Sequence, residues 1–147
     1  MIDAHLQAIL ADAEKAGVYH LPHMDKKQVV AAAKAAGLAA FRVNLAKAGD
    51  KEQLLAAIAR ALKFPDWFGH NLDALADCVA DMGWKPAEGY LVLLEHCDGI
   101  HGKSEEAFSS VLNVFEQTAD EWREQGVPFW CLVEMQADGI AWLPAEP

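Results

Sequence analysis

Short apolar segments of strand length alternate with helical patterns along this chain, and this alternation constrains the fold more than any other feature. Residues 89–95 form a continuous apolar run, GYLVLLE, typical of a strand that is covered on both faces. A second run, VPFWCLVE, occupies residues 127–134. Between the two runs, apolar side chains recur at helical spacing at Phe108, Val111, Leu112, Phe115, Ala119 and Trp122. Strands separated by helices pair in parallel through right-handed crossovers, so we expect a parallel sheet.

The first half of the chain repeats the same alternation. Residues 25–37 and 50–62 each open with Asp and carry Gln three positions later, which is the pattern of a helix capping box. Each of these predicted helices belongs to a unit with a short β-prone segment before it, Val18–Leu21 or Ala40–Leu45. Residues 1–17 alternate apolar and polar side chains and predict a further helix at the start.

The fold class predicted from these elements is α/β, with a small, mainly parallel sheet flanked by helices in three layers. A chain of 147 residues suits one domain, and no linker or low-complexity stretch divides it. Residues 139–143, GIAWL, predict an additional edge strand. No apolar run reaches the 18 residues of a membrane-spanning helix, so we expect no membrane association.

Charge is distributed unevenly. Residues 1–63 contain nine Lys or Arg and six Asp or Glu, whereas residues 64–147 contain three and sixteen. An acidic surface repels phosphates and attracts basic proteins, so we expect no direct binding to nucleic acid. The three cysteines are widely spaced and lack a CxxC pair, and the N-terminus lacks the features of a signal peptide. These features indicate reduced thiols and a cytoplasmic protein without a cofactor.

The stretch FPDWFGHNLDALADC, residues 64–78, combines large aromatic side chains with unpaired acids. Asn71 is a favourable N-cap and would place the first helical residue at Leu72. From there, the helical period predicts one narrow buried face, and its expected members are Leu72, Leu75, Ala76 and Val79.

A second face of the same predicted helix carries Asp73, Asp77 and Asp81 at a spacing of four residues. Like charges at this spacing destabilise a helix by about 0.2–0.5 kcal/mol per pair. Three interpretations remain open at this point: a solvated helix end, a divalent-metal site, and a surface that binds a basic protein.

The whole stretch resembles the signature of the barstar family, intracellular protein inhibitors of the ribonuclease barnase. The shared pattern is an apolar residue, Pro, an acid, two aromatics, Gly, one variable residue, Asn-Leu-Asp-Ala-Leu, one variable residue and Asp-Cys. A looser similarity covers about residues 40–134, and SVLNVF at residues 110–115 is similar to the last helix of the family. The resemblance implies a single barstar-like domain over residues 1–147, with residues 1–38 as an N-terminal extension packed on it.

The resemblance also implies how the stretch is used. In the family, the loop and the following helix cover the active site of the nuclease. Asp77 matches the central acidic anchor, Asp73 matches a second contact acid, and Trp67 stands where a contact tyrosine lies. The implied partner-binding positions are Trp67, Phe68, Gly69, Asn71, Asp73, Ala76, Asp77 and Gln117.

Two of these positions depart from the family pattern. Ala76 replaces a tryptophan found in barstar, and Gln117 stands where the last helix supplies a further acid, with Glu116 next to it on a different face. The expected function is inhibition of a basic, secreted or toxic ribonuclease by an acidic loop and helix. The alternative is an immunity or binding module of the same fold for a different basic protein or toxin.

Other motifs give weaker indications of chemistry. HGKS at residues 101–104 lacks the first glycine of a phosphate-binding loop, because position 97 is Cys97, and is better explained as a turn before a helix. HLPH at residues 20–23 and the group His96, Cys97 and His101 do not have the four ligands of a structural zinc site. We therefore expect no enzymatic activity and no metal centre.

Overall fold

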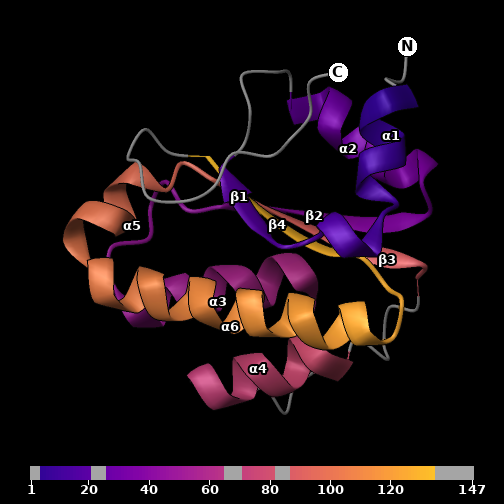
Figure 1. Cartoon of the computed structure of the whole chain (residues 1–147). Helices are drawn as coiled ribbons and strands as arrows, with labels where there is room; N and C mark the ends of the chain where they lie inside the picture. Colours follow the sequence, from indigo (N-terminus) through magenta and orange to yellow (C-terminus); the bar gives the residue numbers. More distant parts are fainter. Residues whose placement is uncertain (1–3, 21–25, 65–70, 82–86, 135–147) are drawn as a thin grey trace.

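In the computed structural model, the described residues are 4–20, 26–64, 71–81 and 87–134, and they form a sheet between layers of helices (Figure 1). The helices are α1 (Ala4–Leu10), the 3-10 helix η1 (Ala13–Lys15), α2 (Lys26–Ala35), α3 (Lys51–Leu62), α4 (Leu72–Asp81), α5 (Asp98–Lys103) and α6 (Glu105–Glu124). The strands are β1 (Val18–His20), β2 (Leu38–Asn44), β3 (Gly89–Glu95) and β4 (Phe129–Val133).

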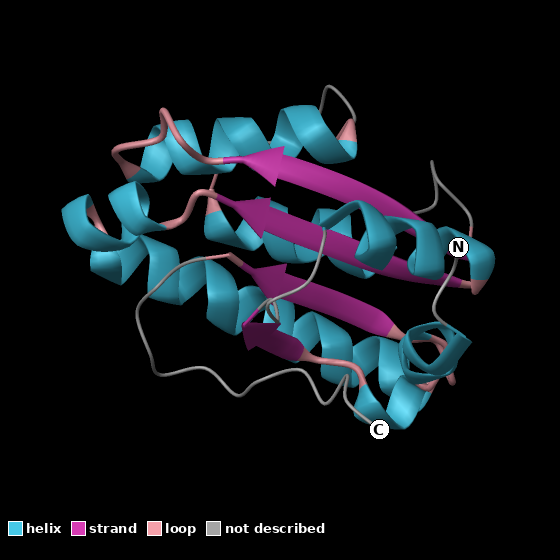
Figure 2. Ribbon diagram, turned by 90° about the horizontal axis from the view of Figure 1, so that it is seen from above, coloured by secondary structure: helices cyan, strands magenta, loops and turns pink. Residues whose placement is uncertain are grey.

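The four strands lie in the order β1-β4-β3-β2, and every pair is parallel (Figure 2). Val92 in the middle of β3 lies opposite Phe41 on one side and Cys131 on the other. The predicted parallel sheet and the three-layer α/β class are therefore confirmed. The predicted edge strand at residues 139–143 lies outside the described residues.

Strand β3 is buried along its whole length and contributes to a hydrophobic core on each face of the sheet. Tyr90, Val92 and Leu94 point to one core, and Leu91 and Leu93 point to the other. Strand β4 is also fully buried and alternates in the same way. This two-sided burial explains why both strands have continuous apolar sequences instead of alternating ones.

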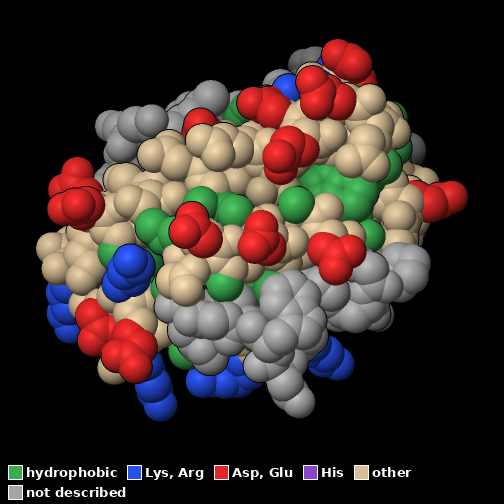
Figure 3. All heavy atoms as spheres, turned by 90° about the horizontal axis from the view of Figure 1, so that it is seen from below, with side chains coloured by type: hydrophobic (Ala, Val, Ile, Leu, Met, Phe, Trp, Pro, Cys, Tyr) green, Lys and Arg blue, Asp and Glu red, His purple; other side chains and the backbone are tan. Residues whose placement is uncertain are grey.

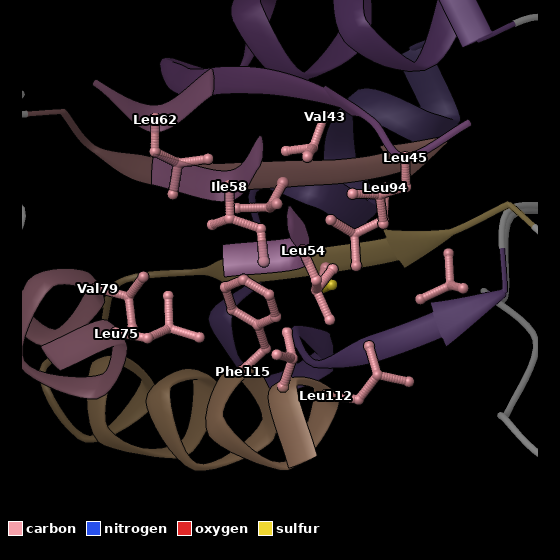
Figure 4. Packing of buried hydrophobic residues seen from close by; sticks show 14 of the residues in the cluster. Val43, Leu45, Leu54, Ile58, Leu62, Leu75, Val79, Leu94, Leu112 and Phe115 are labelled. Atoms are coloured by element: carbon pink, nitrogen blue, oxygen red, sulfur yellow. The ribbon is translucent and has the colours of Figure 1, made fainter. Parts of the chain in front are cut away.

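The larger core fills the space between the sheet and helices α3, α4 and α6 (Figure 4). Ile58 from α3 and Phe115 from α6 lie directly under the sheet, while Leu75 and Val79 reach this core from α4. Helix α4 packs against α6 and lies on the side of it away from the sheet (Figure 1). It therefore forms an outer layer with one face free for solvent or a partner.

The second core lies on the opposite face of the sheet and is closed by the N-terminal elements. Leu10 of α1 and Val29 of α2 are fully buried there against Leu91 and Trp130. The indole N–H of Trp130 donates to the carbonyl oxygen of Leu10 at 2.8 Å. The N-terminal elements thus cover a face of the sheet that would otherwise expose apolar side chains to water.

The N-terminal helix is shorter than the sequence predicts. Helix α1 ends at Leu10, and a 3-10 turn, η1, follows. The carboxylate of Asp12 accepts a hydrogen bond from the backbone N–H of Glu14 at 2.9 Å. A short acidic side chain competes with the helix for backbone hydrogen bonds in this way, so the helix stops before Asp12.

The capping pattern at the start of α3 is confirmed, with one difference of detail. The carboxylate of Asp50 accepts from the backbone N–H of Gln53 at 2.8 Å. The side-chain oxygen of Gln53 accepts from the N–H of Gly49 at 2.8 Å, one residue before the position that a standard capping box uses. Two backbone donors at the helix entrance are satisfied by this exchange.

A network of charged side chains joins the N-terminal part to the carboxyl ends of the strands. The ammonium group of Lys26, at the start of α2, lies 3.2 Å from Glu95 and 2.8 Å from Glu134. The guanidinium of Arg42 donates to both carboxylate oxygens of Glu95, at 2.8 and 3.0 Å. A bidentate pair of this kind is among the stronger charge-assisted contacts.

The network lowers the pKa of both carboxyl groups. The hydrogen bonds from Arg42 hold the pKa of Glu95 below its ordinary value of 4.5 and outweigh the opposing effect of burial. Burial raises the pKa of Glu134, but the hydrogen bonds from Lys26 and from the backbone of His96 bring it below 4.5. The ionised form of both carboxyl groups is therefore more favourable in the folded chain than in the unfolded chain.

We expect this network to stabilise the fold at neutral pH and to lose its effect in acid. A carboxyl group with a lowered folded pKa contributes stability above its unfolded pKa, and this contribution disappears as the pH falls through the folded value. Lys26→Met should lower the free energy of unfolding by about 1–2 kcal/mol at neutral pH and by much less near pH ~3. Urea denaturation at the two pH values measures this difference.

Lys34→Met is the matched control, because Lys34 is exposed in the last turn of the same helix. It should change the free energy of unfolding little at either pH. An equal loss of stability for Lys26→Met at both pH values would contradict the role assigned to the network.

Candidate functional site

Helix α4 begins at the predicted residue. The side-chain oxygen of Asn71 accepts from the backbone N–H of Ala74 at 2.7 Å, and the carbonyl of Asn71 accepts from the N–H of Leu75 at 2.9 Å. This cap satisfies a donor that the first helical turn leaves without an intrahelical partner. Asn71 therefore determines where the acidic helix begins.

The carboxylates of Asp73, Asp77 and Asp81 are all exposed on α4. Within the part of the chain that the structure describes, none of the three lies within 4.0 Å of a Lys, Arg or His nitrogen. Seen from below, acidic side chains spread over α4 and α6, with hydrophobic side chains between them (Figure 3). The predicted acidic face thus exists and continues onto the neighbouring helix.

The buried face of α4 differs from the predicted one. Leu75, Cys78 and Val79 are fully buried, whereas Leu72 and Ala76 are only half-buried. The apolar stripe is rotated toward Cys78, on the side where α4 packs against α6 and the edge of the large core. Ala76 consequently lies at the margin of the acidic face, where it is half-buried.

The C-terminal end of α4 is held by an aromatic residue of α6. The indole N–H of Trp122 donates to the carbonyl oxygen of Val79 at 3.0 Å. The indole ring packs against the ring of Tyr90 in β3, with a centroid distance of 5.4 Å. A chain of contacts thus joins the sheet to the acidic helix through α6.

The two flanks of α6 carry different acids. Glu116 lines a hollow of about 280 Å³ together with Val18 and Tyr19, on the side of the N-terminal elements. Ala107 lines a separate hollow of about 520 Å³ with Leu72, on the side of α4. Glu116, which the sequence predicts to lie on a face different from that of Gln117, thus lies on the flank of the N-terminal elements.

Glu121 is an acid on the α4 flank of α6, and it is not among the contact positions that the family resemblance implies. Its side chain is exposed. Ala107, Val114 and Glu121 are spaced seven residues apart, close to two helical turns, so the three side chains lie along the same side of α6. Gln117 is also exposed, one turn earlier. The seven-residue spacing that aligns Glu121 with Ala107 is visible in the sequence. That this side of α6 faces α4 follows only from the packing of the two helices.

Three predicted contact residues, Trp67, Phe68 and Gly69, lie outside the described residues, and their contact role stays a prediction. Of the other predicted contact residues, Asn71 caps α4, Asp73 and Asp77 are exposed on α4, and Gln117 is exposed on α6, the helix against which α4 packs.

One group among the described residues has the composition of a metal site. Oxygen or nitrogen atoms of Glu95, His96 and Glu134 lie within 4.8 Å of one another. The ammonium of Lys26 already contacts both carboxylates of this group. The position that a metal ion would take is therefore occupied by a positive charge of the protein itself.

The cysteines do not have the environment of nucleophiles or metal ligands. Cys78, Cys97 and Cys131 are free and buried, as predicted. Burial, assisted by the charges of Asp77 and Asp81, raises the pKa of Cys78 to about 11. Burial raises the pKa of Cys97 to about 12, and its thiol donates to the carbonyl of Leu94. Neutral thiols of this kind are poor nucleophiles at physiological pH.

The HGKS segment comprises the last three residues of α5 and Ser104, which separates α5 from α6. Lys103 ends α5, and the hydroxyl of Ser104 donates to the carbonyl of Gly49 at 3.0 Å before α6 begins at Glu105. The sequence predicted a turn before a helix at this segment; in the structure Ser104 immediately precedes α6, but residues 101–103 belong to a further helix, α5, that was not predicted. Among the described residues, no helix is both long enough and apolar enough to cross a membrane.

Comparison with solved structures confirms the kind of fold. A structure of the Aeropyrum pernix ORC2 protein in its ADP form matches with a TM-score of 0.54 and 20% sequence identity. The match covers 91% of this chain but only 39% of that protein. An identity this low shows a shared arrangement of strands and helices and no more. Among the curated proteins, no sequence matches this chain.

Comparison with protein families gives a more specific result. The family described as "Barstar (barnase inhibitor)" matches residues 38–134. These residues run from β2 to the residue after β4 and include α4, α6 and the acidic face. The match spans more than half of the chain and agrees with the signature at residues 64–78, so the protein belongs to the barstar family.

Proposed function

We propose that this protein inhibits a basic ribonuclease by covering the active site of the enzyme with the acidic face of α4 and the adjoining flank of α6. The observation that carries the proposal is the set of exposed carboxylates of Asp73, Asp77 and Asp81, none of which has a basic partner in the described chain. The inhibitor acts in the cytoplasm and has no catalytic chemistry or cofactor of its own.

The arrangement of charge on α4 is unfavourable for the isolated protein. Asp77 and Asp81 follow Asp73 at intervals of four residues, and no basic residue lies in the last turn of the helix. Each like-charged pair costs about 0.2–0.5 kcal/mol, and a negative charge at a helix C-terminus opposes the helix dipole. A charged hydrogen bond to a partner contributes about 1.5–3 kcal/mol, which outweighs this cost.

The chemistry of the carboxylates fits the active site of a nuclease. A ribonuclease binds the phosphates of RNA with cationic side chains, and carboxylates held on a helix present negative charge to the same cations. Arginine binds carboxylate and phosphate in the same bidentate geometry. Asp77 occupies the middle of the acidic face, so we propose that it is the central anchor and Asp73 a second contact.

The neighbouring helix extends the surface. Glu121 supplies an acid on the α4 flank of α6, one turn beyond Gln117. We propose that Glu121 contributes the charge that Gln117 does not. By the family resemblance, Trp67, Phe68 and Gly69 would contact the partner from the loop before α4, and Asn71 would line that loop.

A second candidate function is the binding of a different basic protein by the same face. It is favoured by the side chain of Ala76, which is half-buried and small at the margin of the acidic face. An interface here has no large apolar anchor from this residue, and large aromatic anchors are typical of interface hot spots. The partner would then be a toxin or regulatory protein that does not cleave RNA.

Asp77→Ala should weaken inhibition of a small basic microbial ribonuclease of the barnase type. Removal of a central charged contact should cost more than about 2 kcal/mol, so the inhibition constant should rise about 30-fold or more. The measurement is a titration of RNA cleavage against inhibitor concentration at low and at moderate salt. Wild-type inhibition should also weaken as salt screens the charges.

Glu52→Ala is the control for this experiment, because Glu52 is an exposed acid in the first turn of α3. It makes the same change in net charge and should alter the inhibition constant by no more than about twofold. Absence of wild-type inhibition, together with capture of a basic protein that is not a nuclease, would favour the second candidate. Equal inhibition by Asp77→Ala and the wild type would exclude the proposed anchor.

The two flanks of α6 provide a matched comparison. Glu121→Gln should raise the inhibition constant about three- to tenfold, the range that corresponds to one net hydrogen bond, because Glu121 lies on the flank beside α4. Glu116→Gln, on the opposite flank, should have a smaller effect. Both changes keep the size of the side chain, and the same titration measures both. The reverse order would show that the partner docks on the flank of the N-terminal elements.

A further inference from the structure

We infer that Trp122 is a positioning residue that holds the C-terminal end of the acidic helix α4 in place for docking. The bond from its indole N–H to the carbonyl oxygen of Val79 is 3.0 Å long and joins α6 to α4. Trp122 does not need to touch the partner to act in this way. This inference rests on the proposed function, because it concerns how the proposed docking surface is held.

The carbonyl of Val79 has a hydrogen-bond donor from outside its helix. Val79 lies two residues before Asp81, the last described residue of α4, and its carbonyl oxygen accepts from the indole N–H of Trp122. No basic side chain lies in the last turn to bind the free carbonyls. Trp122 supplies a donor at this end, as Asn71 supplies an acceptor at the other end.

The indole is itself held by buried aromatic residues of the sheet. Its ring packs on Tyr90 at a centroid distance of 5.4 Å, and Tyr90 packs on Phe129 at 6.1 Å. Phe129 is fully buried in β4, and Tyr90 is buried in β3. The position of the indole N–H is therefore fixed by two central strands, and through it the position of Val79.

Helix α4 depends on such a contact more than an inner helix does. Its ten described residues carry three exposed like charges, and among the described elements it packs chiefly against α6. Isolated helices of this length are only marginally stable in water, so tertiary contacts must keep it formed and oriented. A surface that is held in its bound conformation before docking loses less conformational entropy on binding.

Trp122→Phe tests the inference because it keeps an aromatic ring beside Tyr90 and removes the N–H donor. In the free protein, backbone amides of α4 should exchange with deuterium about three- to tenfold faster, the range that corresponds to one net hydrogen bond. Amides of α3 and β3 should not change relative to global unfolding. With a barnase-type ribonuclease as partner, the dissociation rate constant should rise by a similar factor, while the association rate constant stays within about twofold.

Trp130→Phe is the matched control, since the indole N–H of Trp130 also donates to a backbone carbonyl, that of Leu10, but on the opposite face of the sheet. It should lower overall stability without changing α4 exchange, measured relative to global unfolding, or the dissociation rate. If the two variants affect α4 exchange equally, the effect is general destabilisation and the inference is overturned.

Hydrogen exchange of the wild-type protein tests the role of Trp122 even when a variant fails to fold. The indole N–H of Trp122 should exchange no faster than the amides of the last turn of α4, because both need the same opening. Faster exchange of the indole N–H would show that α4 stays in place without this bond, which overturns the inference. These exchange data need no partner, so they remain decisive if the nuclease proposal itself fails.

Discussion

The rest of the structure depends on the burial of strands β3 and β4 on both faces. Each strand sends alternate side chains into two separate cores, so neither face of the sheet can be left open to water. Helices α3 and α6 cover one face, and the N-terminal helices α1 and α2 cover the other. Residues before the family match therefore have a structural task, because they close the second core around Leu91, Leu93 and Trp130.

The acidic helix α4 lies outside this arrangement and is held by a few well-defined contacts. Asn71 caps its start, Leu75 and Val79 reach the large core, and Trp122 binds its end. These contacts offset the repulsion among its exposed carboxylates. The exposed carboxylates of this helix have no basic partner among the described residues, and the core fixes the helix that carries them. A surface held in this way loses less conformational entropy when a partner binds.

Local chemistry made much of the fold predictable, and the errors have physical causes. The four strands of the described sheet, the cap at Asn71 and the start of α3 follow from side-chain patterns within a few residues, and the structure agrees with them. The predicted buried face of α4 included Ala76, whereas the structure buries Cys78 instead. Helical periodicity alone does not determine which neighbouring element a helix packs against, so the orientation of the face could not be predicted. The ion network of Lys26 escaped prediction because its members are far apart in the chain.

The sequence by itself determined the α/β class, the parallel sheet, the acidic face with Asp73 and Asp77, and the family, since these depend on periodicity, capping and a contiguous motif. Only the tertiary structure decided that α4 packs on α6, that Glu121 lies on the flank beside it, and that Trp122 binds Val79. The reason is that contacts between residues distant in the chain depend on how the cores on the two faces of the sheet are filled, and no local pattern specifies that filling.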